Sequence, residues 1–431
     1  MTTDSPTALG VWQGSSRVGT LWRGSDERLI GFEYDSDWQA QGRPISHSLP
    51  LTRKAWEPET LTAHHWFGNL LPEEQARDAL IKRLGLPDDD FTLLAAIGGD
   101  CAGALSILPL DERPAKPEHT SAAAAYRELD AGRLSHWAAF KDRYAIMADE
   151  LPDTRPRLSL AGAQDKIPVF LDQDRVYIPT SQAPSTHILK FAVAGREQVI
   201  LNELYLNTLA RLTGLPCPPC RIGYAERHPY LIVERYDRRG IGSTQIERIH
   251  QEDLCQAQGI PRSRKYQAFG GPDFGTIVQT VRDACKPAAR SIQQLLHWQL
   301  FNVLAGNSDG HAKNISLVQD ERGRWQIAPA YDLVGTIVLG YHPDLAFSIG
   351  QQYNSIQLLP RDWQAFSKAC RFSYPYVKRQ IKYIAGTLAE AARSSTLKAA
   401  LQEAGLSDKG WGRLQQQRQH IQRQCRRAER W

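Results

Sequence analysis

Long apolar runs are missing from this chain of 431 residues. No stretch approaches the roughly 18 consecutive apolar residues that cross a membrane as a helix. The start, Met-Thr-Thr-Asp, also lacks the basic region and following apolar region of an export signal. With 42% hydrophobic and 23% charged residues, the composition is that of ordinary globular material, long enough for two or three domains. We therefore expect a cytoplasmic protein.

A cysteine framework is missing as well. The seven cysteines are odd in number and scattered along the chain, as free thiols in a reducing compartment are. Cys217 and Cys220 have a zinc-like spacing, but no second Cys or His pair completes a tetrahedral site. The sequence therefore favours free thiols and disfavours structural zinc.

A strong excess of one charge is also absent. The net charge of +5 permits contact with nucleic acid without requiring it. Much of the excess lies in residues 411–431, where the basic residues face a single acid, Glu429. These residues are Arg413, Arg418, Arg423, Arg426, Arg427 and Arg430. A solvated helix face is the slightly favoured interpretation, and contact with DNA phosphates is the alternative.

The most informative stretch that is present spans residues 306–314 and is followed by an apolar strand, a turn and Asp332. Phosphoryl transfer needs one carboxylate near the attacking hydroxyl, and an amide and a second carboxylate to hold magnesium. Asp309, Asn314 and Asp332 supply these types in that order. Each acid alone would be an ordinary turn residue, but the combination between an apolar helix and two short strands predicts a catalytic loop.

A second stretch, residues 158–170, contains three consecutive small residues at 161–163. Small residues let the backbone approach a phosphate closely, and consecutive amides form an anion-binding nest. The stretch is not a Walker motif. The Gly-rich residues 98–103 fit neither common phosphate-loop spacing and precede a strand, so we interpret them as a structural turn.

Lys190 lies in a short predicted strand at residues 186–191, among apolar neighbours. A lysine in such a place is costly unless it meets an anion, which makes Lys190 a candidate phosphate ligand. The alternative is an edge-strand lysine that discourages aggregation. In the helix that follows, Glu203 is left open between pairing with Lys190 and facing solvent.

The periodicity predicts a mixed α/β fold. Strand-and-turn patterns cover residues 8–50, and helical periodicity is clear at 291–305 and 376–430. Residues 230–237 have the pattern of a buried strand leading into a polar connector. In a two-lobed kinase such a segment contacts adenine, but an ordinary core strand would show the same pattern. We predict an N-terminal α/β subdomain (1–115), a connector (116–157), an ATP-binding part (158–240) and a helical C-terminal lobe with the catalytic loop (241–431), with ATP in the cleft between lobes.

These motifs together resemble the HipA family of serine/threonine kinases, the toxins of type II toxin–antitoxin pairs. The resemblance covers nearly the whole chain. It is carried by residues 67–73, 98–103, 159–166, 187–191, 233–238, 251–256 and 309–314. It implies a two-lobed kinase fold with an N-terminal strand-rich subdomain and a mostly helical C-terminal lobe.

The resemblance also implies individual roles. Asp309 would be the catalytic base, Asn314 and Asp332 the magnesium ligands, and Ser159 the site of autophosphorylation. The residues implied at the nucleotide are Ala161, Gly162, Ala163, Gln164, Asp165, Lys166, Lys190, Glu234, Tyr236, His311, Lys313 and Tyr331. Asp165 stands where a Glu is common in the family, which is a conservative change. A phosphate on Ser159 beside a loop that receives ATP phosphates would repel the nucleotide.

The resemblance further implies ATP and Mg²⁺ as cofactors, and a helix-turn-helix antitoxin similar to HipB. The pair would bind operator DNA and repress its own expression. Free toxin would phosphorylate a protein such as an aminoacyl-tRNA synthetase and cause growth arrest or persistence. Two alternatives remain, a small-molecule phosphotransferase on a related fold and a non-catalytic DNA-binding corepressor.

Overall fold

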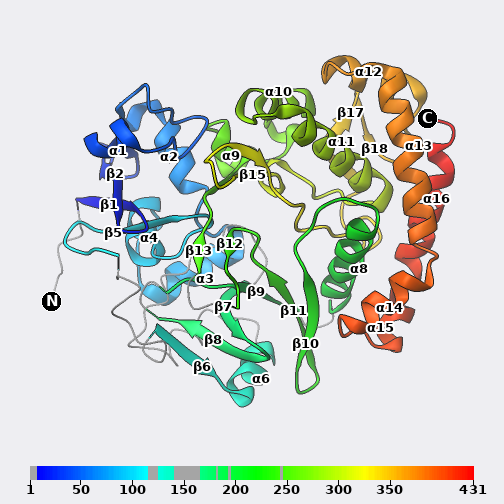
Figure 1. Ribbon diagram of the computed structural model, residues 1–431, viewed down its shortest axis with the longest axis horizontal. Helices are drawn as coiled ribbons and strands as arrows, with labels where there is room; N and C mark the ends of the chain where they lie inside the picture. Colours follow the sequence, from blue (N-terminus) through cyan, green and yellow to red (C-terminus); the bar gives the residue numbers. More distant parts are fainter. Residues whose placement is uncertain (1–6, 115–124, 140–165, 181–182, 193–195, 243–245) are drawn as a thin grey trace. The chain divides into compact units, whose positions relative to one another are not determined.

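The computed structural model describes residues 7–114, 125–139, 166–180, 183–192, 196–242 and 246–431. The chain forms two compact units (Figure 1). The N-terminal unit comprises Met1–Lys190, Arg235–Arg262 and Val318–Gly323, and the C-terminal unit comprises Phe191–Glu234, Ser263–Leu317 and Arg324–Trp431. Among the helices of the described ranges, none combines the length and apolarity required to cross a lipid bilayer.

The N-terminal unit begins with a five-stranded antiparallel sheet in the order β4-β3-β2-β1-β5. Its strands are β1 (Ala8–Gln13), β2 (Ser16–Arg23), β3 (Ile30–Tyr34), β4 (Ala55–Trp56) and β5 (Leu105–Pro109). Gly14 has φ +57° in the tight turn between β1 and β2, a conformation that glycine adopts without steric cost. The helical elements of this part are α1 (Ser36–Gln41), η1 (Pro58–Thr60), α2 (Thr62–Gly68), α3 (Glu74–Leu84) and α4 (Asp90–Ile97).

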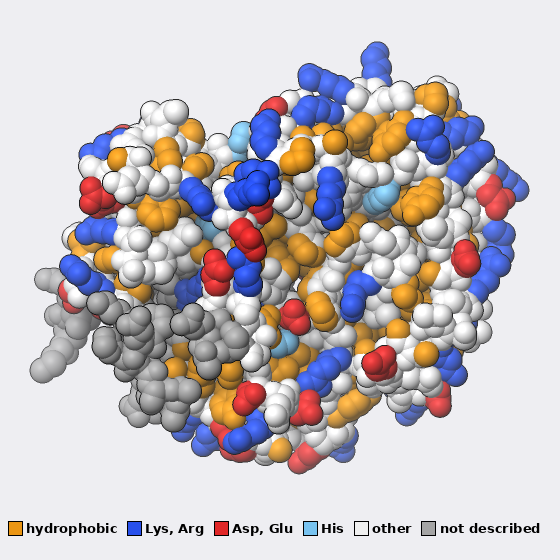
Figure 2. Space-filling model, in the orientation of Figure 1, with side chains coloured by type: hydrophobic (Ala, Val, Ile, Leu, Met, Phe, Trp, Pro, Cys, Tyr) orange, Lys and Arg blue, Asp and Glu red, His pale blue; other side chains and the backbone are white. Residues whose placement is uncertain are grey.

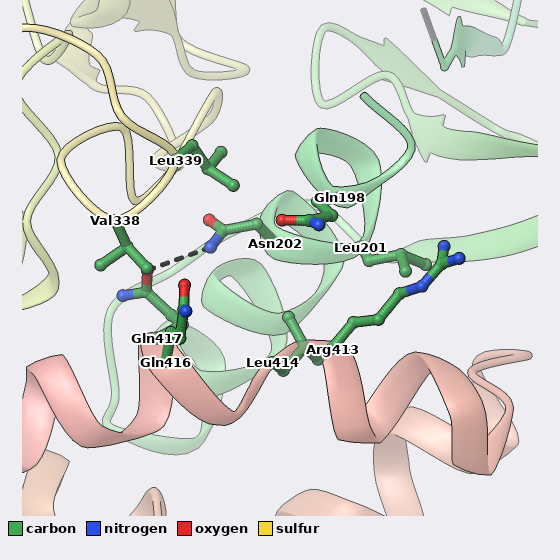
Figure 3. A pocket seen from close by; sticks show the side chains of 9 residues that line it. All are labelled: Gln198, Leu201, Asn202, Val338, Leu339, Arg413, Leu414, Gln416 and Gln417. Carbon is green, nitrogen blue, oxygen red and sulfur yellow. Dashed lines mark hydrogen bonds between the residues drawn. The ribbon is translucent and has the colours of Figure 1, made fainter. Parts of the chain in front are cut away.

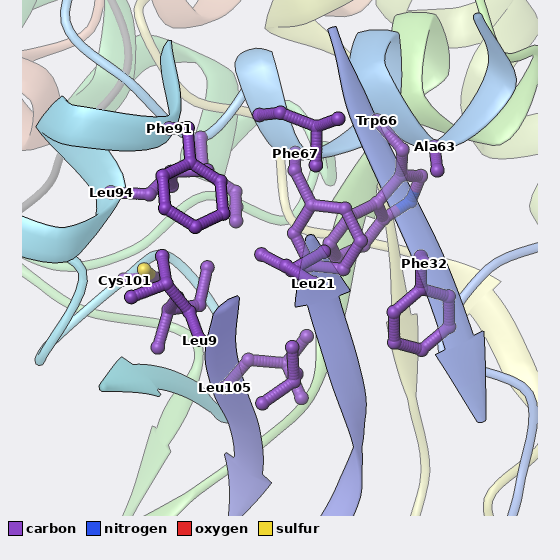
Figure 4. Packing of buried hydrophobic residues seen from close by; sticks show 14 of the residues in the cluster. Leu9, Leu21, Phe32, Ala63, Trp66, Phe67, Phe91, Leu94, Cys101 and Leu105 are labelled. Carbon is purple, nitrogen blue, oxygen red and sulfur yellow. The ribbon is translucent and has the colours of Figure 1, made fainter. Parts of the chain in front are cut away.

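One hydrophobic core joins this sheet to its helices (Figure 4). Leu9 and Leu21 face each other across β1 and β2, and both are fully buried. The ring of Phe32 packs at 5.3 Å from that of Phe67 on α2. Each such side chain contributes roughly 1.5–3 kcal/mol when it is fully buried. This core accounts for the strand-and-turn pattern at the start of the chain.

A second group of antiparallel strands in the N-terminal unit has the order β9-β7-β8-β6. These are β6 (Tyr126–Leu129), β7 (Lys166–Asp172), β8 (Arg175–Pro179) and β9 (His187–Phe191), with α6 (Ala131–Ala139) following β6. β6 and α6 lie in the segment predicted as a connector. The predicted domain boundaries stay predictions. The unit is completed by β12 (Arg238–Arg239), β13 (Glu247–Arg248), β14 (Gln251–Asp253) and α9 (Leu254–Ala257).

Buried ion pairs between arginine and aspartate side chains hold the turn at residues 98–103 in place within this unit. The guanidinium of Arg238 donates to Asp100 at 2.8 Å, and that of Arg235 donates to Asp237 at 2.7 Å. The backbone N–H of Gly103 donates to Asp237 at 2.7 Å. All four charged side chains are buried. The Gly-rich turn therefore has a structural role, which agrees with its interpretation from the sequence.

The C-terminal unit is mostly helical, as predicted. Its helices are α8 (Gln198–Leu212), α10 (Phe274–Ala284), α11 (Ala288–Ala305), α12 (Pro360–Ala369), α13 (Tyr374–Ala391), α14 (Ser395–Glu403), α15 (Asp408–Arg413) and α16 (Gln415–Ala428). Its strands are β10 (Cys220–Ala225), β11 (His228–Glu234), β16 (Trp325–Ile327), β17 (Asp344–Ile349) and β18 (Gln352–Asn354). The strand β15 (Ser316–Gln319) begins in this unit and ends in a segment of the N-terminal unit. Short 3-10 turns are η3 (Arg262–Arg264), η4 (Gln267–Phe269) and η5 (Ala312–Asn314).

Helix α8 corrects one detail of the sequence interpretation. The spacing of Leu201, Leu204, Leu209 and Leu212 predicts one apolar face on this helix, and the first three of these leucines are buried. Leu212, at the end of the helix, is 42% exposed, so the buried face does not extend to it. Glu203 is buried, so its solvent-facing alternative is wrong.

The surface of helices α13 and α16 is basic in the view of Figure 2. The guanidinium of Arg418 lies over the ring of Trp411, 4.2 Å from its centroid, where the electron-rich face of the ring attracts the cation. The arginines at 413, 423, 426, 427 and 430 are exposed, as the predicted solvated face requires. All seven cysteines are free thiols, as expected.

Candidate functional site: a phosphoryl-transfer loop

The predicted catalytic loop begins where α11 ends. Gly306 ends the helix in the left-handed region, with φ +75°, which closes a helix without a Cβ clash. The N–H of Asn307 then donates back to the carbonyl of Asn302 at 2.9 Å. The side chain of Asn307 repeats this link, because its amide donates to the side-chain oxygen of Asn302 at 3.0 Å. The loop therefore leaves the helix in one defined direction.

Asp309 is held half-buried at the tip of this turn. Its N–H donates to the side chain of Asn307 at 3.0 Å, which fixes the backbone. Its carboxylate oxygen Oδ1 accepts a hydrogen bond from the hydroxyl of Tyr266. A carboxylate that is both anchored and accessible suits a group that receives a proton from an acceptor hydroxyl.

Asn314 is tied to Asp309 through the backbone. Its side-chain amide donates to the carbonyl of Asp309 at 2.8 Å, and the N–H of His311 donates to the same carbonyl at 2.8 Å. The one-turn helix η5 brings the side chain of Asn314 back to the backbone of Asp309, five residues earlier. The bond uses the amide nitrogen of Asn314, so the side-chain oxygen is the atom that would bind a cation.

Tyr331 links the loop of Asp332 to the catalytic loop. Its hydroxyl donates to the carbonyl of Lys313 at 2.6 Å and lies 2.7 Å from the hydroxyl of Ser316. Asp332 itself has φ +57°, the left-handed region that costs a non-glycine residue roughly 1–2 kcal/mol. Such a strained conformation persists only where the surrounding structure imposes it, and it is frequent at active sites.

Asn314 and Asp332 supply as many protein ligands as a magnesium ion bound with a nucleotide requires. Among the residues that the structure describes, no group of three His, Cys, Asp or Glu side chains is placed to hold a metal. A magnesium ion bound with a nucleotide does not need one, because it takes one or two protein oxygens and completes its shell with phosphates and water. Asn314 and Asp332 provide one amide oxygen and one carboxylate.

A shell of buried polar side chains supports both loops from behind. The N–H of Ser308 donates to the hydroxyl of Thr336 at 2.7 Å, which joins the catalytic loop to the segment after Asp332. Asn202 on α8 accepts from the N–H of Gly335 at 2.6 Å and donates to Gln417 at 3.0 Å. These last contacts line a pocket among α8, α16 and residues 338–339 (Figure 3). The two loops are thus positioned by one connected set of bonds.

Two predicted phosphate ligands lie in the N-terminal unit. Lys166 and Lys190 are direct partners across the antiparallel strands β7 and β9. Like charges placed directly opposite each other are unfavourable, and a phosphate beside them would offset that repulsion. Lys190 is only 7% exposed, which argues against the edge-strand alternative.

The other residues predicted at the nucleotide lie in different elements of the chain. Glu234 ends β11, half-buried, and burial raises the pKa of its carboxyl above the usual range. The hydroxyl of Tyr236 donates to the side chain of Gln251. His311 and Lys313 are buried within the catalytic loop. Ser159 and residues 161–165 lie outside the described residues.

Several supporting residues were not predicted from the sequence. Tyr266, Thr336 and Gln417 lie far along the chain from their partners, with no local pattern to mark them. Asn302 is different, because it is a polar residue within the apolar helix α11 and is 2% exposed. A buried asparagine in a helix needs hydrogen-bond partners, and that signal was open to sequence reasoning.

Comparisons with known proteins agree with this geometry. The model of the HipA-like C-terminal domain matches residues 158–396, and that of the HipA N-terminal domain matches residues 9–108. Y4mE of Sinorhizobium fredii, a kinase by name, is 35% identical over 398 residues, covering 89% of this chain and 90% of its own. The serine/threonine-protein kinase toxin HipA of Shewanella oneidensis is 29% identical over 385 residues, which cover 85% of this chain and 84% of that protein.

A solved structure extends the match to the fold. The complex of HipA, HipB and operator DNA from Shewanella oneidensis MR-1 aligns with a TM-score of 0.79 and 26% identity, covering 97% of both chains. This match confirms the predicted fold class. The chain therefore belongs to the HipA family of serine/threonine-protein kinases.

Proposed function

We propose that this kinase transfers the γ-phosphoryl group of ATP to a Ser or Thr hydroxyl, with Asp309 as the base. In this step the hydroxyl oxygen forms a bond to the γ-phosphorus, and the bond from that phosphorus to the β–γ bridging oxygen breaks. ADP leaves, and the hydroxyl proton passes to the carboxylate of Asp309. The arrangement that carries the proposal is the hydrogen bond from the side-chain amide of Asn314 to the carbonyl of Asp309. The bond from the hydroxyl of Tyr331 to the carbonyl of Lys313 joins the turn of Asp332 to the same loop.

The other proposed roles concern nucleotide binding. Asn314 and Asp332 would hold magnesium, which neutralises phosphate charge when it is bound. Phosphate ligands would be Lys166, Lys190 and residues 161–165. Glu234 and Tyr236 would contact the adenine, with His311, Lys313 and Tyr331 nearby.

We extend the proposal to the biology of the family. The chain would act as a toxin that phosphorylates a translation component such as an aminoacyl-tRNA synthetase, and it would silence itself by phosphorylation of Ser159. The solved relative is a complex with HipB and operator DNA, which supports a HipB-like antitoxin and DNA as partners of this chain. This part is tested by co-purification of the chain with the antitoxin and by retention of operator DNA on the complex. The control is the antitoxin mixed with an unrelated protein, which should not retain the DNA.

The first experiment is intact-mass spectrometry before and after incubation with Mg²⁺ and ATP. We expect a gain of one phosphate in the wild type, no gain in Asp309→Asn or Ser159→Ala, and an unchanged gain in the control Asp344→Asn. Asp344 is an exposed acid outside the loop, with a side chain 51% exposed. Full activity in Asp309→Asn would contradict its role. A wild type that binds ATP, arrives unphosphorylated and gains nothing would favour the small-molecule or corepressor alternatives.

A further inference from the structure

Tyr266 lies on a short segment that is fastened to the catalytic loop by its backbone. The N–H of Ala312, in that loop, donates to the carbonyl of Lys265 at 3.1 Å. On the other side, Gln267 and Ser348 exchange two hydrogen bonds, with the backbone N–H of Ser348 at 2.9 Å and the side-chain amide of Gln267 at 3.0 Å. The segment therefore has fixed contacts both before and after the tyrosine.

The ring of Tyr266 is also held in place. It meets the ring of His311 edge-on at 4.9 Å and that of Phe269 at 5.9 Å. Such edge-to-face pairs are worth about 0.5–1.5 kcal/mol beyond the burial of their surface. The N–H of Gly271 donates to the carbonyl of Tyr266 at 3.0 Å and closes the turn. A Cβ at Gly271 would lie 2.2 Å from the carbonyl oxygen of Arg264, so this turn requires glycine.

We propose that Tyr266 is a positioning residue for Asp309, an inference that rests on the proposed function. Its hydroxyl donates to Oδ1 of the Asp309 carboxylate. The terminal torsion of an aspartate is broad, so an unsupported carboxylate samples many planes. A donor on Oδ1 fixes that plane and directs Oδ2 to the acceptor hydroxyl. Well-oriented reacting groups account for a large part of enzymatic rate, and small misplacements cost up to about 100-fold.

A different interpretation would make Tyr266 a gate. A hydroxyl bonded to the catalytic base occupies the place that an acceptor hydroxyl needs, so its removal would speed the reaction. Rotation of the Tyr266 side chain would break its ring contacts with His311 and Phe269. A shift of its backbone would also break the bond from Ala312 to Lys265. Because all three contacts hold the residue in place, the observations favour positioning.

The test is Tyr266→Phe, which keeps the ring contacts and removes only the donor. We expect kcat, taken as the rate constant for phosphorylation of Ser159 and the accompanying ADP formation at saturating Mg-ATP, to fall roughly 10- to 100-fold, with KM for ATP and the nucleotide dissociation constant unchanged. Tyr383→Phe is the matched control, because Tyr383 is 53% exposed and lies outside the loop. A purely structural role would lower the amount of folded protein without this split between kcat and KM.

A second variant keeps the test decisive if Tyr266→Phe folds poorly. Gln267→Ala removes the contact with Ser348 and should lower kcat by a smaller factor without changing nucleotide affinity. In the Tyr266→Phe background, Gln267→Ala should cause no further loss of kcat, because both substitutions act on the orientation of the Asp309 carboxylate. If the losses in kcat of the two single variants add in the double variant, the inference is overturned. If Tyr266→Phe cannot be measured, an unchanged kcat in Gln267→Ala overturns it.

The outcomes separate the two proposals. If the wild type forms ADP and Asp309→Asn does not, an unchanged rate in Tyr266→Phe overturns the positioning role alone. A faster rate in Tyr266→Phe overturns it in favour of the gate. If the wild type and Asp309→Asn form ADP equally, or neither does, the proposed function fails and the positioning role fails with it.

Discussion

Asn202 donates a hydrogen bond from its side chain to that of Gln417 at 3.0 Å, across 215 residues of sequence (Figure 3). Gln417 in turn donates to the carbonyl of Ala305, at the end of α11, at 2.7 Å. The same asparagine accepts from Gly335, where a Cβ would lie 2.0 Å from the Gln417 oxygen. Helix α16 thus supports the start of the catalytic loop and the segment after Asp332 through one buried amide.

We expect Gln417→Leu to lower the free energy of unfolding by about 2–4 kcal/mol. The leucine is of similar size but leaves the Ala305 carbonyl and the Asn202 amide without their partner, and each unsatisfied buried group costs about 1–3 kcal/mol. Urea denaturation measures the effect. Gln416→Leu is the control on the neighbouring exposed position. Equal midpoints for the two variants would show that the buried amide is dispensable.

The left-handed backbone of Asp332 predicts a separation of activity from stability. Asp332→Asn and Asp332→Ala should both lose phosphoryl transfer, because neither supplies a carboxylate. The alanine variant should be less stable than the asparagine variant by about 1 kcal/mol, since Asn tolerates positive φ better than Ala. Thermal denaturation and the phosphorylation assay measure the two properties.

Glu226 provides the control for that comparison. It has φ +51° in the exposed turn between β10 and β11. Glu226→Ala should again be less stable than Glu226→Asn, but both should retain full activity. An active Asp332→Ala protein would refute the proposed magnesium role.

The buried cluster around Asp237 predicts acid sensitivity. Burial by itself raises the pKa of Asp237, but the charges of Arg235 and Arg238 outweigh it and hold that pKa below the usual range. An aspartate in the unfolded chain has a pKa of about 3.9. The folded state therefore binds the proton less readily, so this stabilisation is present above about pH 4 and is lost as the pH falls further.

Asp237→Asn should lower the free energy of unfolding at pH 7 by roughly 3–5 kcal/mol, because it leaves buried arginine charge uncompensated. It should also weaken the dependence of stability on pH below pH 4. Denaturation at several pH values measures both effects, with the exposed Asp344→Asn as control. A variant as stable as the wild type at pH 7 would contradict the prediction.

His420 predicts a second pH effect, in the C-terminal unit. Burial, followed by the charges of Arg423 and Arg427, lowers the pKa of His420 to about 4. Between this value and the unfolded pKa of about 6.5, the unfolded state binds more protons. Stability is therefore complete above about pH 6.5 and falls by up to about 3 kcal/mol toward pH 4.

His420→Gln should remove the part of this pH dependence that comes from protonation of His420. The change in denaturation midpoint between pH 7 and pH 5 should therefore be smaller in the variant than in the wild type. His342→Gln is the control, because the side chain of His342 is 78% exposed. If both variants follow the wild-type curve, protonation of His420 does not couple to folding.

Much of the fold was predictable because it follows from local patterns. The strand at 187–191, the helix at 291–305 and the turn before β5 all depend on hydrophobic period and turn chemistry within a few residues. The types and order of Asp309, Asn314 and Asp332 indicated the chemistry in the same way. Leu212 shows the limit, because it shares the helical period of the buried leucines of α8 but is exposed in the folded chain.

The sequence by itself determined the main strand and helix patterns, the family and the chemical types at the candidate site, although β6 and α6 lie where a connector was predicted. Only the tertiary structure decided which side chains support them. Tyr266 and Asp309 are 43 residues apart, and Asn202 and Gln417 are 215 apart. Hydrogen bonds between such distant residues have no period along the chain, because the packing of whole helices brings the partners within reach.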